Sequence, residues 1–224
     1  MSQDVQKVAR HMDLLGAEVL AIYPARLTTG KRLEKVAALC GAIQKVSSRQ
    51  TRAVFCDFPC ADIPPALYKK MIRTEGKKYG LSADNLLFTS DIGYPLGFPR
   101  EGVMELFQLS NLFICPSYSE SFGLTVLEAA SQGNFLVLNQ AVPALQELGG
   151  GKLGAYFFRW DARNFGFDTR ETYNPSEQAY YEDHGRDILR RMDSDPALSA
   201  KTLVRTHYSH RWVMENQLLP LLKG

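Results

Sequence analysis

The sequence has no long apolar run. None of its 224 residues lies in a stretch that approaches the roughly eighteen apolar residues needed for a membrane-spanning helix. The first residues, MSQDVQKVARHMDLLG, are polar and do not contain the apolar segment of a secretory signal peptide. We therefore expect a cytoplasmic protein.

A strong excess of one charge is also absent. The formal net charge is +2, and lysines and arginines are spread along the chain. A balance this close gives no reason to expect a nucleic-acid partner or an anionic membrane surface. An anionic ligand therefore has to be sought at a local site.

Cysteine is scarce, with only Cys40, Cys56, Cys60 and Cys115. Cys56 and Cys60 have no second pair and no nearby histidine, and three of the four lie in or beside predicted core elements. This pattern favours buried, reduced thiols over a zinc site or disulfides. We expect no metal site.

The sequence does contain an alternation of short apolar runs and helical patterns. The predicted strands are Val19–Tyr23, Ala53–Phe58, Leu86–Thr89, Leu112–Cys115, Phe135–Leu138 and Ala155–Phe158. The predicted helices between them are Arg32–Val46, Pro65–Tyr79, Gly102–Leu109, Phe122–Gln132 and Pro143–Leu148. Continuous apolar strands alternating with helices predict a parallel sheet that is covered on both faces. We expect an α/β, Rossmann-like three-layer domain with about six mostly parallel strands over residues 18–224, preceded by a tail or linker helix at 1–17.

The stretch NLFICPSYSESFGLTVLEAASQG, residues 111–133, predicts a strand, a polar loop and a helix. Pro116 cannot continue the strand, Ser121 can cap the helix, and Gly133 can close it in a left-handed turn. Apolar or small residues occupy nearly every side of this helix. We therefore expect it to be buried.

Two glutamates in this stretch are placed for chemistry. Glu128 is a carboxylate in an otherwise apolar helix, which is costly unless polar groups meet it. Glu120 directly precedes the helix, where exposed backbone N–H groups attract anions. At about 1.5 Å of rise per residue the two carboxylates lie on the order of 10 Å apart, roughly the length of a sugar–diphosphate–ribose unit. Taken alone, however, two glutamates near a helix start are also an ordinary surface pattern.

The first strand-to-helix loop, YPARLTTGKRLEKV, places Arg26 and Lys31 five residues apart around a Thr-Thr-Gly turn. Two cations beside the N–H groups of a helix start suit a diphosphate, because arginine can bind it bidentately and lysine supplies a point charge. The glycine-rich dinucleotide fingerprint is missing from this loop. Its absence counts against an NAD-dependent enzyme.

The segment PSYSE-SFGLTVLE-AASQG resembles the E-x7-E motif of retaining nucleotide-sugar glycosyltransferases, family four (group 1) of the GT-B fold. The resemblance covers their C-terminal, donor-binding domain, so the fold that it implies is the C-terminal half of a GT-B enzyme. It implies that Glu120 approaches the donor sugar and that Glu128 binds the ribose hydroxyls. The backbone between them would meet sugar and phosphate, at Ser121, Phe122, Gly123 and Leu124. The first loop matches the same family, in which Arg26 and Lys31 would neutralise the diphosphate without a metal.

The third loop follows the strand at Leu86–Thr89. By the same resemblance, Ser90 and Asp91 would contact the nucleobase, largely through the backbone; a plain Asx-type turn is the alternative. The aromatic and charged stretch at residues 159–183 predicts an insertion. It would line an acceptor or contact a partner domain, or else form a surface excursion packed by its own aromatics.

The resemblance implies a retaining hexosyltransferase that uses a UDP-, GDP- or ADP-sugar and needs no cofactor. No acceptor domain precedes the donor-like domain, so we expect a partner N-terminal domain and no turnover by this chain alone. Any peripheral membrane association would belong to the full enzyme only. Two alternatives stay open: a nucleotide-binding or interaction module without catalysis, and half of a GT-B sugar-nucleotide epimerase.

Overall fold

A computed structural model describes residues 1–150, 153–159, 175–207 and 210–223. It contains one six-stranded parallel sheet with the strand order β3-β2-β1-β4-β5-β6. The strands are β1 (Val19–Arg26), β2 (Thr51–Phe58), β3 (Leu86–Phe88), β4 (Leu112–Cys115), β5 (Phe135–Asn139) and β6 (Tyr156–Phe158). The predicted α/β, Rossmann-like architecture is confirmed, and each predicted strand corresponds to one of these six.

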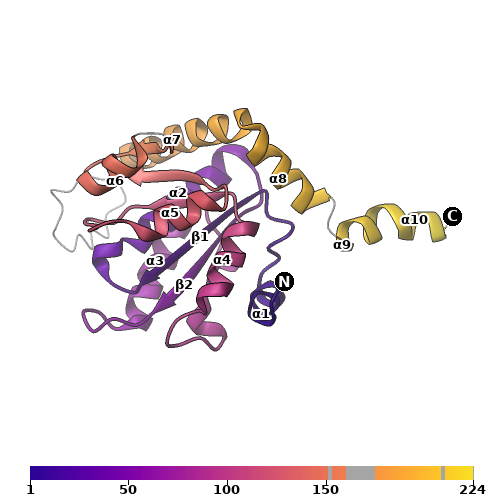
Figure 1. Ribbon diagram of the computed structural model, residues 1–224, viewed down its shortest axis with the longest axis horizontal. Helices are drawn as coiled ribbons and strands as arrows, with labels where there is room; N and C mark the ends of the chain where they lie inside the picture. The colour runs from indigo at the N-terminus through magenta and orange to yellow at the C-terminus, as the bar shows by residue number, and fades with distance from the viewer. Residues whose placement is uncertain (151–152, 160–174, 208–209, 224) are drawn as a thin grey trace.

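Helices flank this sheet (Figure 1). The α-helices are α1 (Gln3–His11), α2 (Leu33–Ser47), α3 (Pro65–Tyr79), α4 (Arg100–Leu109), α5 (Leu124–Ser131), α6 (Pro143–Gly149), α7 (Pro175–Ser194), α8 (Pro196–His207), α9 (His210–Val213) and α10 (Leu219–Lys223). Short turns of 3₁₀-helix are η1 (Thr29–Lys31), η2 (Ala83–Asn85) and η3 (Thr89–Ile92), and η4 (Met214–Leu218) is π-helical. Helix α2 packs against α3 and α7, whereas α4 packs against α1 and α5.

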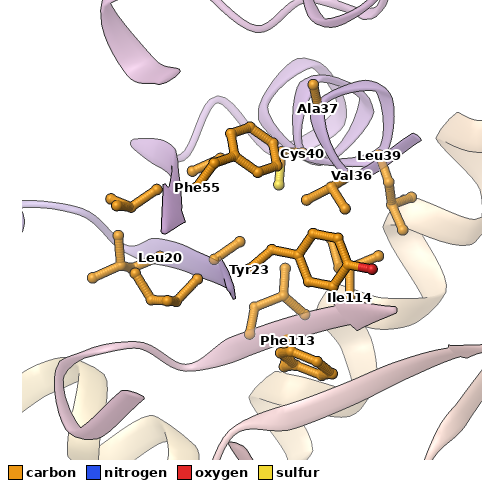
Figure 2. Close-up of a cluster of buried hydrophobic side chains, with 14 of the residues drawn as sticks. Leu20, Tyr23, Val36, Ala37, Leu39, Cys40, Phe55, Phe113 and Ile114 are labelled. Carbon is orange, nitrogen blue, oxygen red and sulfur yellow. The ribbon is translucent and has the colours of Figure 1, made fainter. Parts of the chain in front are cut away.

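The core lies between β1, β2, β4 and helix α2 (Figure 2). The register of β1 on β2 runs without a break from Val19↔Thr51 to Arg26↔Phe58. Helix α2 approaches α3 closely at Gly41, where an added Cβ would lie 2.9 Å from the backbone of Tyr79. Glycine at this position therefore permits the two helices to pack on the sheet side by side.

The N-terminal segment forms the helix α1, which buries Val5 and Val8 against the domain. Tyr94 donates a hydrogen bond of 2.6 Å from its hydroxyl to Asp4 Oδ1 on this helix. Helix α1 is thus packed on the domain and is not a free tail.

The predicted insertion at residues 159–183 ends in a helix, because α7 begins at Pro175 and buries Tyr181. Residues 160–174 of that prediction lie outside the described residues. Helix α8 begins at Pro196, and Asp195 caps it: Asp195 Oδ1 accepts the N–H of Ala197 at 2.9 Å. Beyond α8, helices α9 and α10 extend away from the domain (Figure 1). Among the helices that the structure describes, none is both long and apolar enough to cross a membrane.

Candidate functional site

The order of the sheet reverses between its two central strands. From β1 the chain proceeds outward to β2 and β3, and from β4 it proceeds in the other direction to β5 and β6. In open α/β sheets, ligands bind beyond the carboxyl ends of the strands at such a reversal. The loops that follow β1 and β4 are the two loops for which the sequence predicted a site.

The structure brings Lys31 and Glu120 together, although they lie 89 positions apart. Lys31 Nζ is 2.5 Å from Glu120 Oε1, and the two side chains are 24% and 13% exposed. The backbones of the two loops also meet, because the N–H of Tyr118 donates to the carbonyl of Gly30 at 3.0 Å. The loops after β1 and β4 therefore form one structural unit.

Three buried polar side chains form hydrogen bonds with these loops on the side of the core. The Tyr23 hydroxyl donates to the carbonyl of Lys31 at 3.2 Å and lies 2.9 Å from Ser117 Oγ. Asn139, at the end of β5, donates from Nδ2 to the carbonyl of Ser117 at 3.1 Å. Tyr23, Ser117 and Asn139 are all buried (Figure 2 shows the Tyr23 ring within the core). None of the three was predicted from the sequence; their polar character in or just beyond strands of the sheet was the available signal.

Cys115 lies beneath Glu120. Its Sγ is 3.8 Å from Glu120 Oε1 and 3.7 Å from Ser117 Oγ. Burial, and then the charge of Glu120, raise the pKa of Cys115 to about 11, so this thiol stays protonated at neutral pH. The expectation of free thiols is confirmed for all four cysteines, and three of them are buried.

Helix α5 begins two residues later than predicted, at Leu124, and Ser121 does not cap it. The N-cap is Gly123, whose φ of 81° is left-handed. A Cβ at Gly123 would lie 2.9 Å from Leu148 Cδ1, so both backbone and space require glycine there. The left-handed turn predicted at Gly133 is confirmed, with a φ of 68°.

The prediction that this helix is buried on nearly every side is wrong. Phe122 is 58% exposed and Leu124 is 65% exposed, whereas Val126 and Ala129 face the core. The side chain of Glu128 is 26% exposed, and its Oε1 accepts a 3.0 Å bond from Arg100 Nη2, whose side chain is 80% exposed. Glu128 is therefore a half-exposed carboxylate with a surface partner, not one enclosed in apolar residues.

Arg26, the last residue of β1, is exposed. Its carbonyl accepts the N–H of Thr28 at 2.8 Å, but no hydrogen bond or ion pair joins its side chain to any residue in the part of the chain that the structure describes. The structure thus places Arg26 at the carboxyl edge of the sheet but does not bring it to Lys31 or Glu120.

Ser90 and Asp91 lie in η3, a 3₁₀ turn in place of the alternative Asx-type turn, and Gly93 closes it with a φ of 99°. Both side chains are bound by neighbouring side chains. Ser90 donates from Oγ to Asp57 Oδ2 at 2.5 Å, and Asp91 accepts from Lys69 at 2.5 Å and from Arg73 at 2.8 Å. Base contacts at this loop would consequently involve the backbone.

The Asp91 pair makes stability sensitive to acid. Partial burial opposes ionisation, but hydrogen bonds from Lys69 and Arg73 outweigh it and hold the pKa of Asp91 below its usual value. A lowered folded pKa stabilises the protein above the unfolded pKa, and this stabilisation is lost as the pH falls through the folded value. We expect Asp91→Asn to be less stable than wild type by up to about 1 kcal/mol at pH 7, since Asp91 is 40% exposed. In urea titrations the difference should shrink below about pH 4; a difference independent of pH would contradict this.

Within the described residues, no three histidine, cysteine, aspartate or glutamate side chains come together as a metal site. Metal independence of the reaction stays a prediction. The two carboxylates of this site are each paired with a different cation: Glu120 with Lys31, and Glu128 with Arg100.

Comparison with solved structures identifies the fold. An α,α-trehalose-phosphate synthase (UDP-forming) from Burkholderia xenovorans, in complex with glucose-6-phosphate, is 16% identical with a TM-score of 0.59; the match covers 100% of this chain and 47% of that chain. HepE from Anabaena, in complex with UDP and glucose, is 15% identical with a TM-score of 0.57 and coverages of 100% and 53%. The C-terminal domain of LpcC, a glycosyl transferase group 1 family protein from Francisella tularensis, is 16% identical with a TM-score of 0.50 and coverages of 85% and 93%.

At these identities the likeness concerns the fold, which is the Rossmann-like fold of GT-B glycosyltransferases. The chain spans about half the length of the first two structures. A search of curated protein sequences gives no significant match. The family model described as glycosyl transferases group 1 matches residues 12–155, which is more than half of the chain. The chain therefore belongs to the glycosyl transferases group 1 family.

Proposed function

We propose that this chain is the donor-binding, C-terminal half of a retaining glycosyltransferase that transfers a hexosyl group from a nucleotide-diphosphate sugar. One observation carries the proposal. A cation and a carboxylate from two distant loops, Lys31 and Glu120, meet at 2.5 Å where the strand order reverses. This is the place at which α/β folds bind nucleotides.

Lys31 and Arg26 supply the positive charge for the diphosphate. The leaving group of the reaction is a nucleoside diphosphate, and cations placed beside it stabilise the charge that develops in the transition state. Lys31 is at the end of η1, directly before α2, whose N-terminal dipole adds to its field. No metal is needed for this role.

Glu120 lies beside Lys31 and orients the transferred sugar through its hydroxyls. The loop from Ser121 to Gly123 directly precedes α5, and Ser121 and Phe122 in it are exposed. In this proposal its backbone N–H groups meet the sugar and phosphate oxygens. Glu128, half-exposed on α5, holds the ribose hydroxyls. Asp91 and Ser90 present their backbone to the base.

The acceptor side belongs to a separate N-terminal domain. The chain spans about half of each two-domain neighbour, and Phe122 and Leu124 beside the site are exposed. Covering these apolar side chains with a partner domain would complete the site and exclude water from it. We therefore expect no turnover by this chain alone, and a cytoplasmic location stays a prediction.

A thermal-shift panel with UDP, GDP and ADP, each with and without EDTA, tests the proposal. At a concentration of 100 times Kd, a ligand that binds only the folded state stabilises it by about 2.7 kcal/mol. For a chain of this size that raises Tm by roughly 5 to 10 °C. We expect UDP to be the stabilising nucleotide, because HepE was solved with UDP and glucose, and we expect EDTA to leave the shift unchanged. No shift with any nucleotide would contradict a donor site in this chain.

Glu128→Ala should weaken UDP binding by about 1 to 3 kcal/mol, since it leaves the ribose hydroxyls without their acceptor. Arg100→Ala is the matched control, because it removes the surface partner of Glu128 and leaves the carboxylate in place. An exposed ion pair contributes at most about 1 kcal/mol, so both variants should unfold close to the wild-type Tm. Calorimetric titration with UDP measures the difference. Equal affinity of the wild type and Glu128→Ala would refute the ribose role.

A further inference from the structure

Arg32, the residue after Lys31, has a backbone conformation that is unfavourable for any residue other than glycine. Its φ of 50° and ψ of 48° are left-handed, and Ser48 is the one other described non-glycine residue with a positive φ. This conformation is unfavourable for a residue with a Cβ and free of strain for glycine. An arginine at this junction of η1 and α2 is therefore expected to contribute something that glycine cannot.

The Arg32 guanidinium packs on the ring of Tyr118. The Arg32 side chain is nearly buried, at 8% exposure for the residue, and its guanidinium carbon lies 4.4 Å from the centroid of the Tyr118 ring. Its Nη1 is buried and has no hydrogen-bond partner in the part of the chain that the structure describes. The ion pair with Glu34 is long, at 3.7 Å. Stacking of the cation on the aromatic face is a favourable interaction at this distance.

Tyr118 belongs to the loop between β4 and α5, two residues before Glu120. Its ring is held by Arg32, and its N–H donates to the carbonyl of Gly30 at 3.0 Å. Both contacts come from the loop that carries Lys31. The segment that presents Glu120 is thus fastened at Tyr118 to the segment that presents Lys31.

We propose that Arg32 is a positioning residue for Glu120: by stacking on Tyr118 it fixes the carboxylate beside Lys31 and lets the site distinguish a nucleotide sugar from the bare nucleotide. The proposal rests on the proposed function, in which Glu120 meets the sugar. Arg32 does not itself contact the diphosphate, since its guanidinium is covered by the Tyr118 ring and by the protein. Its loss should therefore affect binding of the sugar and spare binding of the diphosphate.

Hydrogen exchange of the free chain tests the contact without a ligand. In Arg32→Gly the Tyr118 amide should exchange about tenfold faster, because the loop loses the stacking that keeps it closed. The midpoint of urea unfolding should stay the same or rise, because glycine relieves the left-handed backbone. Ser48→Gly is the matched control: it gives the same relief at the other end of α2 and should leave Tyr118 exchange unchanged.

Arg32→Asn distinguishes the loss of the guanidinium from the added backbone flexibility of glycine. Asparagine tolerates the left-handed region and retains a Cβ, but it cannot stack on Tyr118 as a cation. Faster exchange at Tyr118 in both variants supports the proposal. Faster exchange in Arg32→Gly alone would assign the effect to backbone freedom and overturn it. Unchanged exchange in both variants would overturn it as well.

Calorimetric titrations with UDP and UDP-glucose test the positioning role. Arg32→Asn should bind UDP-glucose about five- to tenfold more weakly, while its affinity for UDP changes less than twofold. Equal losses for the two ligands would mean that Arg32 acts on the diphosphate, and would overturn the proposal. If the wild type binds neither ligand, the proposed function fails; the exchange experiment then still decides whether Arg32 holds the Tyr118 loop.

Discussion

Asp57→Ala is expected to lower the free energy of unfolding by about 3 to 5 kcal/mol, the usual effect of breaking a buried ion pair. Asp57, near the end of β2, is fully buried. Its Oδ1 accepts the N–H of Ser90 at 3.0 Å, and its Oδ2 accepts the Ser90 hydroxyl at 2.5 Å and lies 3.6 Å from Lys69 Nζ. Alanine would leave the Ser90 N–H and hydroxyl without their acceptor, and the nearly buried Lys69 would keep Asp91 as its carboxylate partner.

The midpoint of thermal unfolding should fall by roughly 10 °C, as expected for a chain of this length. Asp193→Ala is the control. Asp193 binds Arg49 through two hydrogen bonds of 2.8 Å, a better geometry than that of Asp57 with Lys69, but its side chain is 53% exposed. Solvent screens such a pair, so we expect a loss below about 1 kcal/mol. Equal losses in the two variants would show that burial does not decide the effect.

The order and type of the elements could be predicted because each strand is a continuous apolar run between turn residues. Strand β4 and helix α3 were predicted to the residue. Strand β1 was predicted too short, at Val19–Tyr23, whereas it continues through Pro24 to Arg26. Its recorded pairing with β4 is confined to Ala21↔Leu112, so Pro24 removes no donor from that side of the ladder.

Sequence reasoning could place Lys31 and Glu120 at one site, because loops after neighbouring parallel strands share an edge of the sheet. It could not find Asp57 or Arg32, whose partners Ser90 and Tyr118 are distant in sequence and known only once the loops are folded. The burial of α5 was misjudged for a related reason. Composition shows that a helix is apolar, but it does not show which of its sides the rest of the chain covers.

Lys31→Ala should weaken UDP binding by about 2 to 3 kcal/mol, or roughly 30- to 150-fold, because charge-assisted hydrogen bonds to phosphate are the strong ones. Uridine carries no phosphate, so its binding should change less than twofold. Calorimetric titration of both ligands measures the contrast. The same loss for uridine and UDP would contradict a phosphate role for Lys31 and indicate a general distortion of the loop.

In the free chain, however, the Lys31 ammonium is already occupied by Glu120 at 2.5 Å, so part of its attraction for phosphate is offset. Glu120→Gln should therefore bind UDP more tightly, by about 0.5 to 1 kcal/mol, the contribution of a partly exposed pair. The same change should reduce the advantage of UDP-glucose over UDP, because the carboxylate that meets the sugar is gone. If Glu120 only repelled the diphosphate, both ligands would gain equally. Tighter binding of UDP together with a smaller preference for UDP-glucose would show that Glu120 has both roles. In the free chain it pairs with Lys31 and weakens the attraction of Lys31 for phosphate, and in the complex it binds the sugar.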